Sequence, residues 1–409
     1  MTVINYKYLI IGGGMTADAT VQGIREIDTT GSIGIISAET DPPYERPPLT
    51  KGLWKDDLKV EDIFLNTASH QVDLILNQKV TKINSAEQTV QIDQGNLYHY
   101  EKLLLATGGK PRRLKNDIPE VIYYRTIGDY RKVLDFSTRY QNFVIIGGGF
   151  IGAEMATALT LHKKKVIMIF PEIGIGGLIF PKSLTTYLNS YFKKKGVSVI
   201  SEELVSGLTK QGNKIIVTTN KNRKIETDCV IAGIGIIPNT ELAESIGIKV
   251  NNGIEVDEFC RTSDPHIFAA GDVANFYNDA LKKRMRVEHE DNAKTMGLLA
   301  GKNMAGAMEP YTHQSYFYSD LFDHGYEAVG DLNPNYDTFI DWFEDNESGV
   351  IYYLDQQRIV GVLLWGVFEQ IDTARDLIHQ NKRYKSKKQL KSLITPTESS
   401  ETPTDEEEK

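Results

Sequence analysis

Cysteine is almost absent from this chain of 409 residues. The two cysteines, Cys229 and Cys260, have thirty residues between them. This spacing fits neither a CxxC pair nor a set of zinc ligands. We therefore expect no disulfide framework and no metal site.

The sequence also lacks a run of eighteen apolar residues and an N-terminal segment of the signal or transit type. We therefore expect no membrane span and a cytoplasmic location. Basic residues are in deficit, because 46 Lys and Arg face 55 Asp and Glu, for a net charge of -9. General binding of nucleic acid depends on contacts between basic side chains and phosphates, so no nucleic-acid partner is expected.

What the chain does contain is 41% hydrophobic and 25% charged residues, the composition of a globular protein long enough for several domains. Residues 8–14 recur as residues 143–149, at an offset of 135. Each copy begins with a β-branched apolar run, typical of a buried parallel strand, and a helical pattern follows it. We predict two βαβ units, with helices over 16–27 and 152–162 and second strands over 32–36 and 165–170.

A glycine-rich turn joins the strand to the helix in both units. The patterns are Gly12-x-Gly14-x-x-Ala17 and Gly147-x-Gly149-x-x-Gly152. The first glycine permits the tight turn, the second lets the backbone approach a pyrophosphate, and the third small residue keeps the helix close to the sheet. One such match can be a structural turn, but two copies in βαβ context favour two dinucleotide sites.

Glu172 follows the second strand of the second unit, 25 residues after Gly147. A carboxylate at this place can accept hydrogen bonds from both hydroxyls of a ribose and repels a 2′-phosphate. The second site is therefore predicted to take NADH rather than NADPH. The alternative is a solvated glutamate at a strand end.

The chain changes character from about Tyr311, where aromatic strands begin. We expect strands over 316–318, 339–343, 351–354 and 360–365 and a helix over 368–378, which together form an α+β domain. From about residue 382 lysines give way to Ser, Thr, Pro and an acidic end. This tail is predicted to be disordered, and its opposite charge blocks leave open a role as an interaction segment.

These features occur together in a known family. The chain resembles the FAD-dependent pyridine nucleotide oxidoreductases of the ferredoxin reductase type, and among them most closely the apoptosis-inducing factor branch. The resemblance rests on both glycine-rich turns and on residues 43–51, 106–109, 125–131, 147–154, 262–272, 287–289 and 313–321.

The resemblance implies an α/β fold with two Rossmann-like dinucleotide-binding domains, in the glutathione-reductase-like architecture, plus the C-terminal α+β domain. The FAD-binding domain is expected over 1–120 and 238–312 and the NADH-binding domain over 121–237. The C-terminal domain is expected over 313–382, and the disordered tail over 383–409.

Site residues follow from the same resemblance. The residues expected to bind FAD are Gly12, Gly13, Gly14, Met15, Thr16, Ala17, Glu39, Arg46, Lys51, Val80, Thr107, Gly108, Arg125, Asp272, Glu288, His289, Glu290 and Tyr318. The residues expected to bind NADH are Gly147, Gly148, Gly149, Phe150, Ile151, Gly152, Glu172 and Gly235. Taken without the family, Arg46 and Lys51 would be interpreted as solvated charges.

Lys51 and Glu154 are the expected catalytic pair. In relatives the matching side chains lie together near the flavin edge that receives hydride. There a cation favours the electron density of reduced flavin, and a carboxylate partner limits the cost of burying that cation. A plain structural salt bridge is the alternative.

The resemblance implies an enzyme that transfers hydride from NADH to FAD. Because no cysteine pair stands beside either turn, electrons are expected to leave the flavin directly. The expected acceptors are a small redox protein (ferredoxin or rubredoxin), a quinone or dioxygen. The alternative is an NADH-responsive signalling or assembly factor with low turnover, and in either case a homodimer is possible.

The chain departs from the family pattern at several positions. Ala38 stands where relatives often carry an acid, with Glu39 one residue on. Glu290 stands where an aromatic residue or histidine is common, and Arg284 or Arg286 is a candidate to neutralise it.

Overall fold

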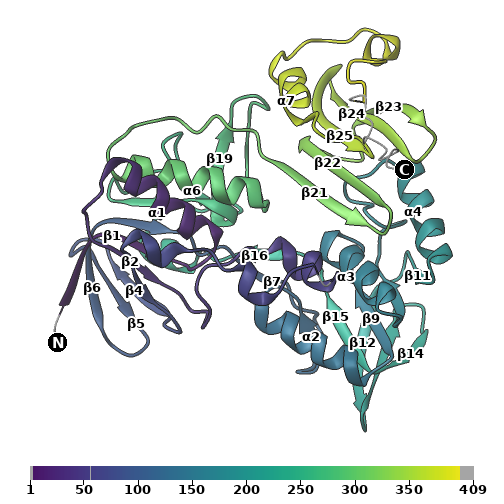
Figure 1. The fold of residues 1–409 in the computed structure, drawn as a ribbon, viewed down its shortest axis with the longest axis horizontal. Coiled ribbons are helices and arrows are strands. Elements are labelled where there is room, and N and C mark those ends of the chain that lie inside the picture. Colours follow the sequence, from purple (N-terminus) through teal and green to yellow (C-terminus); the bar gives the residue numbers. More distant parts are fainter. Residues whose placement is uncertain (1–2, 56, 397–409) are drawn as a thin grey trace, which may run out of the picture.

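The structure is a computed structural model that describes residues 3–55 and 57–396. It has three parts: a sheet with α1 and α6 at the left of Figure 1, a second sheet at the lower right, and a C-terminal sheet at the upper right.

The first part is built on the first βαβ unit. Tyr8 to Ile11 are all buried, which explains why this apolar run forms a central parallel strand. The sheet order is β3-β2-β1-β6-β5-β4, with β18 beside β6. Its elements are β1 (Val3–Ile11), α1 (Met15–Ile27), β2 (Ile33–Ile36), β3 (Asp73–Ile75), β4 (Val80–Asn84), β5 (Thr89–Ile92), β6 (Leu97–Leu105) and β18 (Ile267–Ala269).

Helix α6 (Glu290–Met304) returns from far along the chain to pack on α1. The contact is close because Gly297 and Gly301 face the α1 backbone. A Cβ on Gly301 would lie 2.1 Å from the carbonyl oxygen of Thr20. The close packing sets the N-terminus of α6 near the first glycine-rich turn.

The second βαβ unit forms a parallel sheet of order β11-β10-β9-β15-β8. An antiparallel sheet of order β12-β13-β14 lies beside it, and β7 and β16 pair where the chain crosses between the two parts. The elements are β7 (Gly109–Pro111), β8 (Ile122–Tyr123), α2 (Ile127–Arg139), β9 (Asn142–Ile146), α3 (Phe150–Leu161), β10 (Lys165–Ile169), α4 (Lys182–Lys194), β11 (Ser198–Ile200), β12 (Val205–Gln211), β13 (Lys214–Thr219), β14 (Lys224–Thr227), β15 (Cys229–Ala232) and β16 (Ile236–Pro238).

The C-terminal part is an antiparallel sheet of order β21-β22-β25-β24-β23 with α7 (Ile371–His379) against it. Its strands are β21 (Tyr316–Leu321), β22 (His324–Gly330), β23 (Asp337–Glu344), β24 (Ser348–Asp355) and β25 (Arg358–Trp365). The helix begins later than residue 368, because Glu369 has a left-handed backbone with φ 61° that interrupts it.

Shorter elements complete the chain: α5 (Glu241–Ser245), β17 (Ile254–Glu255), β19 (Ala274–Asn278), β20 (Lys283–Met285), and the 3-10 turns η1 (Pro47–Thr50), η2 (Gly52–Trp54), η3 (Val60–Ile63), η4 (Thr67–His70), η5 (Gly271–Val273) and η6 (Lys387–Leu390).

The prediction of disorder over 383–409 is wrong for its first part. Tyr384, Leu390 and Ile394 are buried with the core of the C-terminal sheet, at 5%, 0% and 1% exposure. The high lysine content of this segment indicated exposure to solvent. Its three spaced apolar side chains, however, pack against the apolar surface that the C-terminal sheet presents in the folded protein. Residues 397–409 of the predicted tail lie outside the described residues.

Candidate active site

The two glycine-rich turns adopt the same backbone conformation. Gly12 and Gly147 both have φ 116°, which L-residues rarely adopt. A Cβ would lie 2.1 Å from the carbonyl oxygen of Ala106 at Gly12 and 2.2 Å from that of Gly233 at Gly147. These first glycines are therefore required by the fold itself.

The second glycines face open space. Gly14 and Gly149 precede the first turns of α1 and α3, and neither helix has a side-chain cap on its free N–H groups. A Cβ on Gly149 would meet nothing within 4 Å, and one on Gly14 would meet only the Arg46 guanidinium, at 4.0 Å. Free N–H donors at a helix N-terminus with room before them fit a pyrophosphate at each turn.

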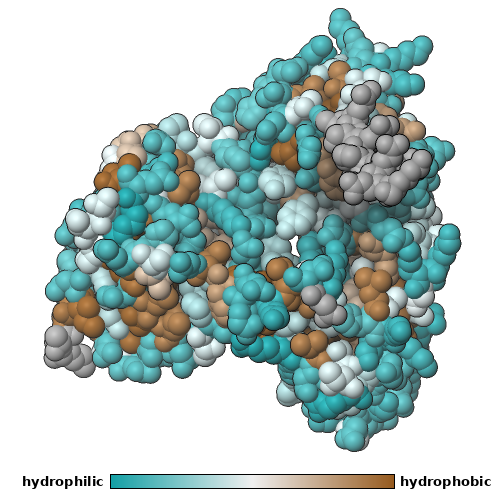
Figure 2. All heavy atoms as spheres, in the orientation of Figure 1, coloured by the Kyte–Doolittle hydropathy of each residue, from teal (hydrophilic) through white to brown (hydrophobic). Residues whose placement is uncertain are grey.

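A cavity of about 1160 Å³ joins the two halves of the site. The face drawn in Figure 2 is hollowed at its centre, where the three parts of the molecule meet. Of the predicted site residues, the cavity is lined by Met15, Arg46, Lys51, Arg125, Gly147, Gly148, Gly149, Phe150, Ile151, Glu154, Glu172, Gly235, Asp272, Glu288, His289, Glu290 and Tyr318.

The other predicted residues do not line the cavity: Gly12, Gly13, Gly14, Thr16, Ala17, Glu39, Val80, Thr107, Gly108 and Gly152. Most of them belong to the turns or to the strand ends of the first sheet. The Val80 side chain is buried in the hydrophobic core of the first sheet. Thr107 and Asn239 exchange hydrogen bonds of 2.7 and 2.8 Å. These bonds join the two segments, next to β7 and β16, in which the chain passes between the first and second parts of the molecule.

Lys51 and Glu154, which are 103 residues apart, form an ion pair of 2.6 Å between Nζ and Oε1. Their side chains are 13% and 4% exposed, so both charges are removed from water. Thr50 and Ser319 complete the site, because their hydroxyls donate to Glu154 at 2.5 and 2.6 Å. The Lys51 ammonium also lies 5.1 Å from the centre of the Tyr318 ring.

This pair can fix one positive charge in the wall of the cavity. The Glu154 carboxylate accepts hydrogen bonds from the hydroxyls of Thr50 and Ser319 in addition to its ion pair with Lys51, so the pair is held in one geometry. Sequence reasoning missed both hydroxyl donors. Thr50 was adjacent to a predicted residue, but nothing in the sequence placed Ser319 near Glu154.

His289 lies between Phe317 and the start of α6. Its ring stacks on Phe317 with centres 4.3 Å apart, and Phe150 meets it edge-on. Burial lowers the pKa of His289 to about 4, so the imidazole is neutral at pH 7. It therefore contributes a neutral polar ring to the cavity rather than a charge.

Glu290 pairs with Lys294, one turn along α6, at 2.5 Å, and not with Arg284 or Arg286, the two candidates that the sequence offered. Arg284 instead binds backbone carbonyls, including that of Asn275 at 2.8 Å, and Arg286 pairs with Glu288. The Glu-to-Lys spacing of four residues was the signal available in the sequence.

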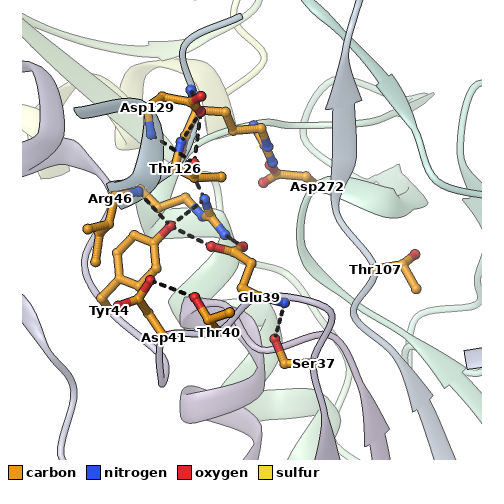
Figure 3. Close-up of polar contacts among 12 residues, drawn as sticks. Ser37, Glu39, Thr40, Asp41, Tyr44, Arg46, Thr107, Thr126, Asp129 and Asp272 are labelled. Carbon is orange, nitrogen blue, oxygen red and sulfur yellow. Dashed lines mark hydrogen bonds and ion pairs between the residues drawn. The ribbon is translucent and has the colours of Figure 1, made fainter. Parts of the chain in front are cut away.

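The loop after β2 carries a polar network beside the first turn, drawn in Figure 3. Arg46 forms an ion pair with Glu39 and donates to Tyr44 at 3.0 Å. The Tyr44 hydroxyl in turn donates to Glu39 at 2.7 Å. The carboxylate of Glu39, predicted to bind FAD, is thus engaged by two side chains of its own loop.

Arg125 and Asp272, which are 147 residues apart in the chain, meet at 3.2 Å. The first residue stands just before α2 and the second in η5, and both line the cavity. Asp129 holds the backbone N–H of Arg125 at 3.0 Å. The sequence predicted both residues as FAD contacts, and the structure places them side by side.

Glu172 lines the cavity from the loop that follows β10. In residues 3–55 and 57–396, no side chain forms an ion pair or hydrogen bond with its carboxylate. A half-buried carboxylate without a protein partner at the end of this strand fits a ribose diol.

The described residues form no metal-binding cluster and no membrane-spanning helix. No group of three or more His, Cys, Asp or Glu side chains there could hold a metal ion. No described helix is both long and apolar enough to cross a membrane.

Comparisons with known proteins agree with this geometry. Residues 6–297 match the family described as pyridine nucleotide-disulphide oxidoreductase, and residues 300–342 and 338–380 match the C-terminal domain described as apoptosis-inducing factor, mitochondrion-associated. The chain is 36% identical to mitochondrial apoptosis-inducing factor 1 of Dictyostelium discoideum, over 95% of this chain and 81% of that protein.

Two further relatives have reductase names. The chain is 32% identical to the ferredoxin--NAD(+) reductase component of the anthranilate 1,2-dioxygenase system of Burkholderia cepacia, over 79% of this chain and 81% of that protein. The fold resembles the covalent putidaredoxin reductase–putidaredoxin complex with a TM-score of 0.86 at 27% identity, over 92% of this chain and 94% of that one. The chain therefore belongs to the pyridine nucleotide-disulphide oxidoreductase family, as an FAD- and NAD(H)-dependent oxidoreductase of the ferredoxin reductase type with an apoptosis-inducing-factor-like C-terminal domain.

Proposed function

We propose that this protein is an NADH:acceptor oxidoreductase. Bound FAD would supply the redox chemistry, by accepting hydride from NADH at N5. The observation that carries the proposal is the Lys51–Glu154 pair, held in the wall of a cavity that both Met15 of the first turn and Gly149 of the second also line. Lys51 would stabilise the negative charge that arrives with hydride.

Electrons would leave without a disulfide relay. Cys229 and Cys260 are both buried, and neither lines the cavity. Burial raises the pKa of the Cys229 thiol to about 12 and that of Cys260 further, so neither forms a thiolate at neutral pH.

The double variant Cys229→Ser, Cys260→Ser tests this direct route. We expect the rate of flavin reduction by NADH to stay within about twofold, because neither thiol touches the site. The free energy of unfolding should fall by ~1 kcal/mol per site, since each new hydroxyl is buried. Stopped-flow absorbance and thermal unfolding measure the two effects, and a large loss of hydride transfer in a folded variant would refute the direct route.

NADH is the proposed nucleotide because of Glu172. Replacing Glu172 with Ala should narrow the preference for NADH over NADPH by about tenfold, or ~1.4 kcal/mol, through the loss of hydrogen bonds to a charged acceptor. Stopped-flow measurement of flavin reduction by NADH and by NADPH gives the ratio of the two rates. Glu202→Gln is the matched control, because Glu202 is an exposed neighbour outside the cavity lining. A wild-type protein that uses both nucleotides equally would remove Glu172 from this role.

The proposed acceptors are a small redox protein, a quinone or dioxygen. The names of two relatives, one a ferredoxin--NAD(+) reductase component and one a putidaredoxin reductase, support a small redox protein. An anaerobic screen of ferredoxin, rubredoxin and quinones against NADH-reduced protein tests this proposal. Rapid turnover with one of them supports an oxidoreductase role, and slow turnover with all of them contradicts it.

A second candidate function follows from the relation to apoptosis-inducing factor, which covers 95% of this chain. The protein would then be an NADH-responsive signalling or assembly factor. This candidate predicts slow turnover with every acceptor, long-lived reduced flavin and a change of association state with NADH. Analytical ultracentrifugation with and without NADH tests the last point. The domain boundaries, the homodimer and the cytoplasmic location stay predictions.

A further inference from the structure

Asp291 stands in the first turn of α6 and lines the cavity. Its side chain is 16% exposed, so its charge is largely removed from water. Three donors from later in the chain meet its Oδ2 atom: His313 Nε2 at 2.6 Å, the backbone N–H of Tyr316 at 3.1 Å and Arg375 Nη2 at 3.4 Å. One carboxylate oxygen of the cavity wall is therefore held by segments of the C-terminal part.

The distances show how the hydrogens of this cluster are shared. At 2.6 Å, a proton has to lie between His313 Nε2 and Asp291 Oδ2. Nε2 therefore carries that proton and donates it to Asp291, whether or not Nδ1 is protonated. Arg375 Nη2 lies 3.2 Å from the same ring nitrogen but cannot use it as an acceptor. Both the imidazole and the guanidinium thus donate to Asp291.

Arg375 comes from α7, 84 residues after Asp291. Its guanidinium is fixed by further contacts: Nε donates to the carbonyl of Gln314 at 2.8 Å, Nη1 donates to Asp372 at 2.9 Å, and the Tyr316 ring centre is 5.6 Å away. The planar, forked guanidinium can make all these contacts at once, whereas a lysine ammonium is a point charge. Arg375 therefore presents its charge to Asp291 in a fixed geometry.

The two carboxylates that contact Arg375 differ in their access to water. Asp372 is 93% exposed, whereas Asp291 is 16% exposed. Solvent and salt screen an exposed pair strongly and a partly buried pair much less. Arg375 therefore compensates mainly the charge of Asp291, although its contact with Asp372 is shorter.

The charge of Asp291 is felt inside the cavity. Burial lowers the pKa of His289, and the carboxylates of Asp272 and Asp291 oppose this shift. Asp272 has Arg125 as its own partner. The balance of charge at the start of α6 is therefore set by Arg375, which itself does not line the cavity.

We propose that Arg375 is a positioning residue of the redox site, which fixes Asp291, balances its charge and so raises the reduction potential of the flavin. The proposal rests on the NADH:acceptor function above, in which FAD occupies this cavity. Reduction adds negative charge to the flavin, and an unbalanced carboxylate in the same cavity opposes that addition. Helix α7, none of whose residues lines the cavity, thereby becomes part of the redox site.

The test is spectroelectrochemistry of the FAD-loaded protein at one pH. Arg375→Met keeps the length of the side chain and removes its charge. At a fixed potential, the ratio of reduced to oxidised flavin should fall about tenfold, or ~30 mV for a two-electron couple. Asp291→Asn should raise the ratio by a similar factor. The double variant should return to within about threefold of wild type, because the charge and its partner are removed together.

Two control variants separate the charge of Arg375 from its packing. Arg375→Lys keeps the positive charge and loses the planar fork, so its ratio of reduced to oxidised flavin should stay within about threefold of wild type. Asp372→Asn removes the exposed carboxylate that contacts the same guanidinium. Its ratio should stay within about twofold, because that charge is screened by water.

An unchanged potential in Arg375→Met would overturn the proposal. Equal shifts in Arg375→Met and Arg375→Lys would also overturn it, because they would show an effect of packing rather than charge. A double variant with a potential as low as that of Arg375→Met would show that Asp291 is not the partner.

If Arg375→Met does not retain FAD, Arg375→Lys and Asp291→Asn decide the question. A ratio near that of wild type in the first and a raised ratio in the second support the proposal, and any other result overturns it. The electrode and mediators replace NADH in this measurement. Failure of NADH to reduce the wild-type flavin would therefore overturn the function proposed above without changing the result for Arg375.

Discussion

Gly14→Val is expected to give a folded protein that binds no FAD. The first turn leaves open space in front of Gly14, where a Cβ would meet nothing closer than the Arg46 guanidinium at 4.0 Å. The chain can therefore accommodate the side chain, but it would occupy the room that a pyrophosphate needs at the N-terminus of α1. Flavin absorbance of the purified protein, with thermal unfolding and circular dichroism, measures both halves of this expectation.

The second turn supplies a matched control. Gly149→Val makes the same change before α3, where a Cβ would meet nothing within 4 Å. This variant should keep its FAD but should no longer be reduced by NADH. The two substitutions should therefore show that the first turn binds FAD and the second binds NADH. A third variant, Gly12→Ala, should fail to fold well, because its Cβ would lie 2.1 Å from the Ala106 carbonyl oxygen. Full flavin content in Gly14→Val would contradict the assignment of the first turn to FAD.

Glu154→Gln should produce the second large effect, on stability and catalysis together. The amide oxygen can still accept from one of the Thr50 and Ser319 hydroxyls while the NH2 group faces the other, but Lys51 loses the partner of its buried charge. Removing one member of a buried pair typically costs 3–5 kcal/mol, so we expect a loss of ~3 kcal/mol in the free energy of unfolding. Hydride transfer from NADH should slow by about 100-fold, because the charge of the pair is no longer balanced or held in place.

Thermal unfolding and anaerobic stopped-flow reduction measure these two losses. Asp323→Asn is the matched control, because Asp323 pairs with Lys195 at the surface, where its side chain is 74% exposed. Breaking that exposed pair should cost ~0.5 kcal/mol and leave flavin reduction unchanged. Normal hydride transfer in Glu154→Gln would leave Lys51 and Glu154 as a structural salt bridge, the alternative that the sequence left open.

Much of the site was predictable because its signals are local. A strand, a glycine-rich turn and a helix follow one another within about fifteen residues, and the first glycine of each turn has a backbone conformation that L-residues rarely adopt. Gly12 and Gly147 have the expected role, with φ 116° at both. The apolar runs of β1 and β9 form the central strands of their sheets for the same local reason.

Other features depended on contacts between distant segments and were missed. The segment from 383 to 396 was interpreted by its charge, although Leu390 and Ile394 are buried in the C-terminal core. A sequence shows that a side chain is apolar or charged, but not which surface it will meet.

The sequence by itself determined that this chain makes two dinucleotide folds, because strand hydrophobicity, turn sterics and helix N-termini are properties of short segments. The tertiary structure alone decided how the chemistry is assembled. The family resemblance, and not the residues themselves, led us to expect the pairing of Lys51 with Glu154 across 103 residues, and nothing led us to expect that Ser319 of the C-terminal sheet donates to that carboxylate. Charges and hydrogen bonds act over a few ångströms of space, so their partners follow from packing rather than from order along the chain.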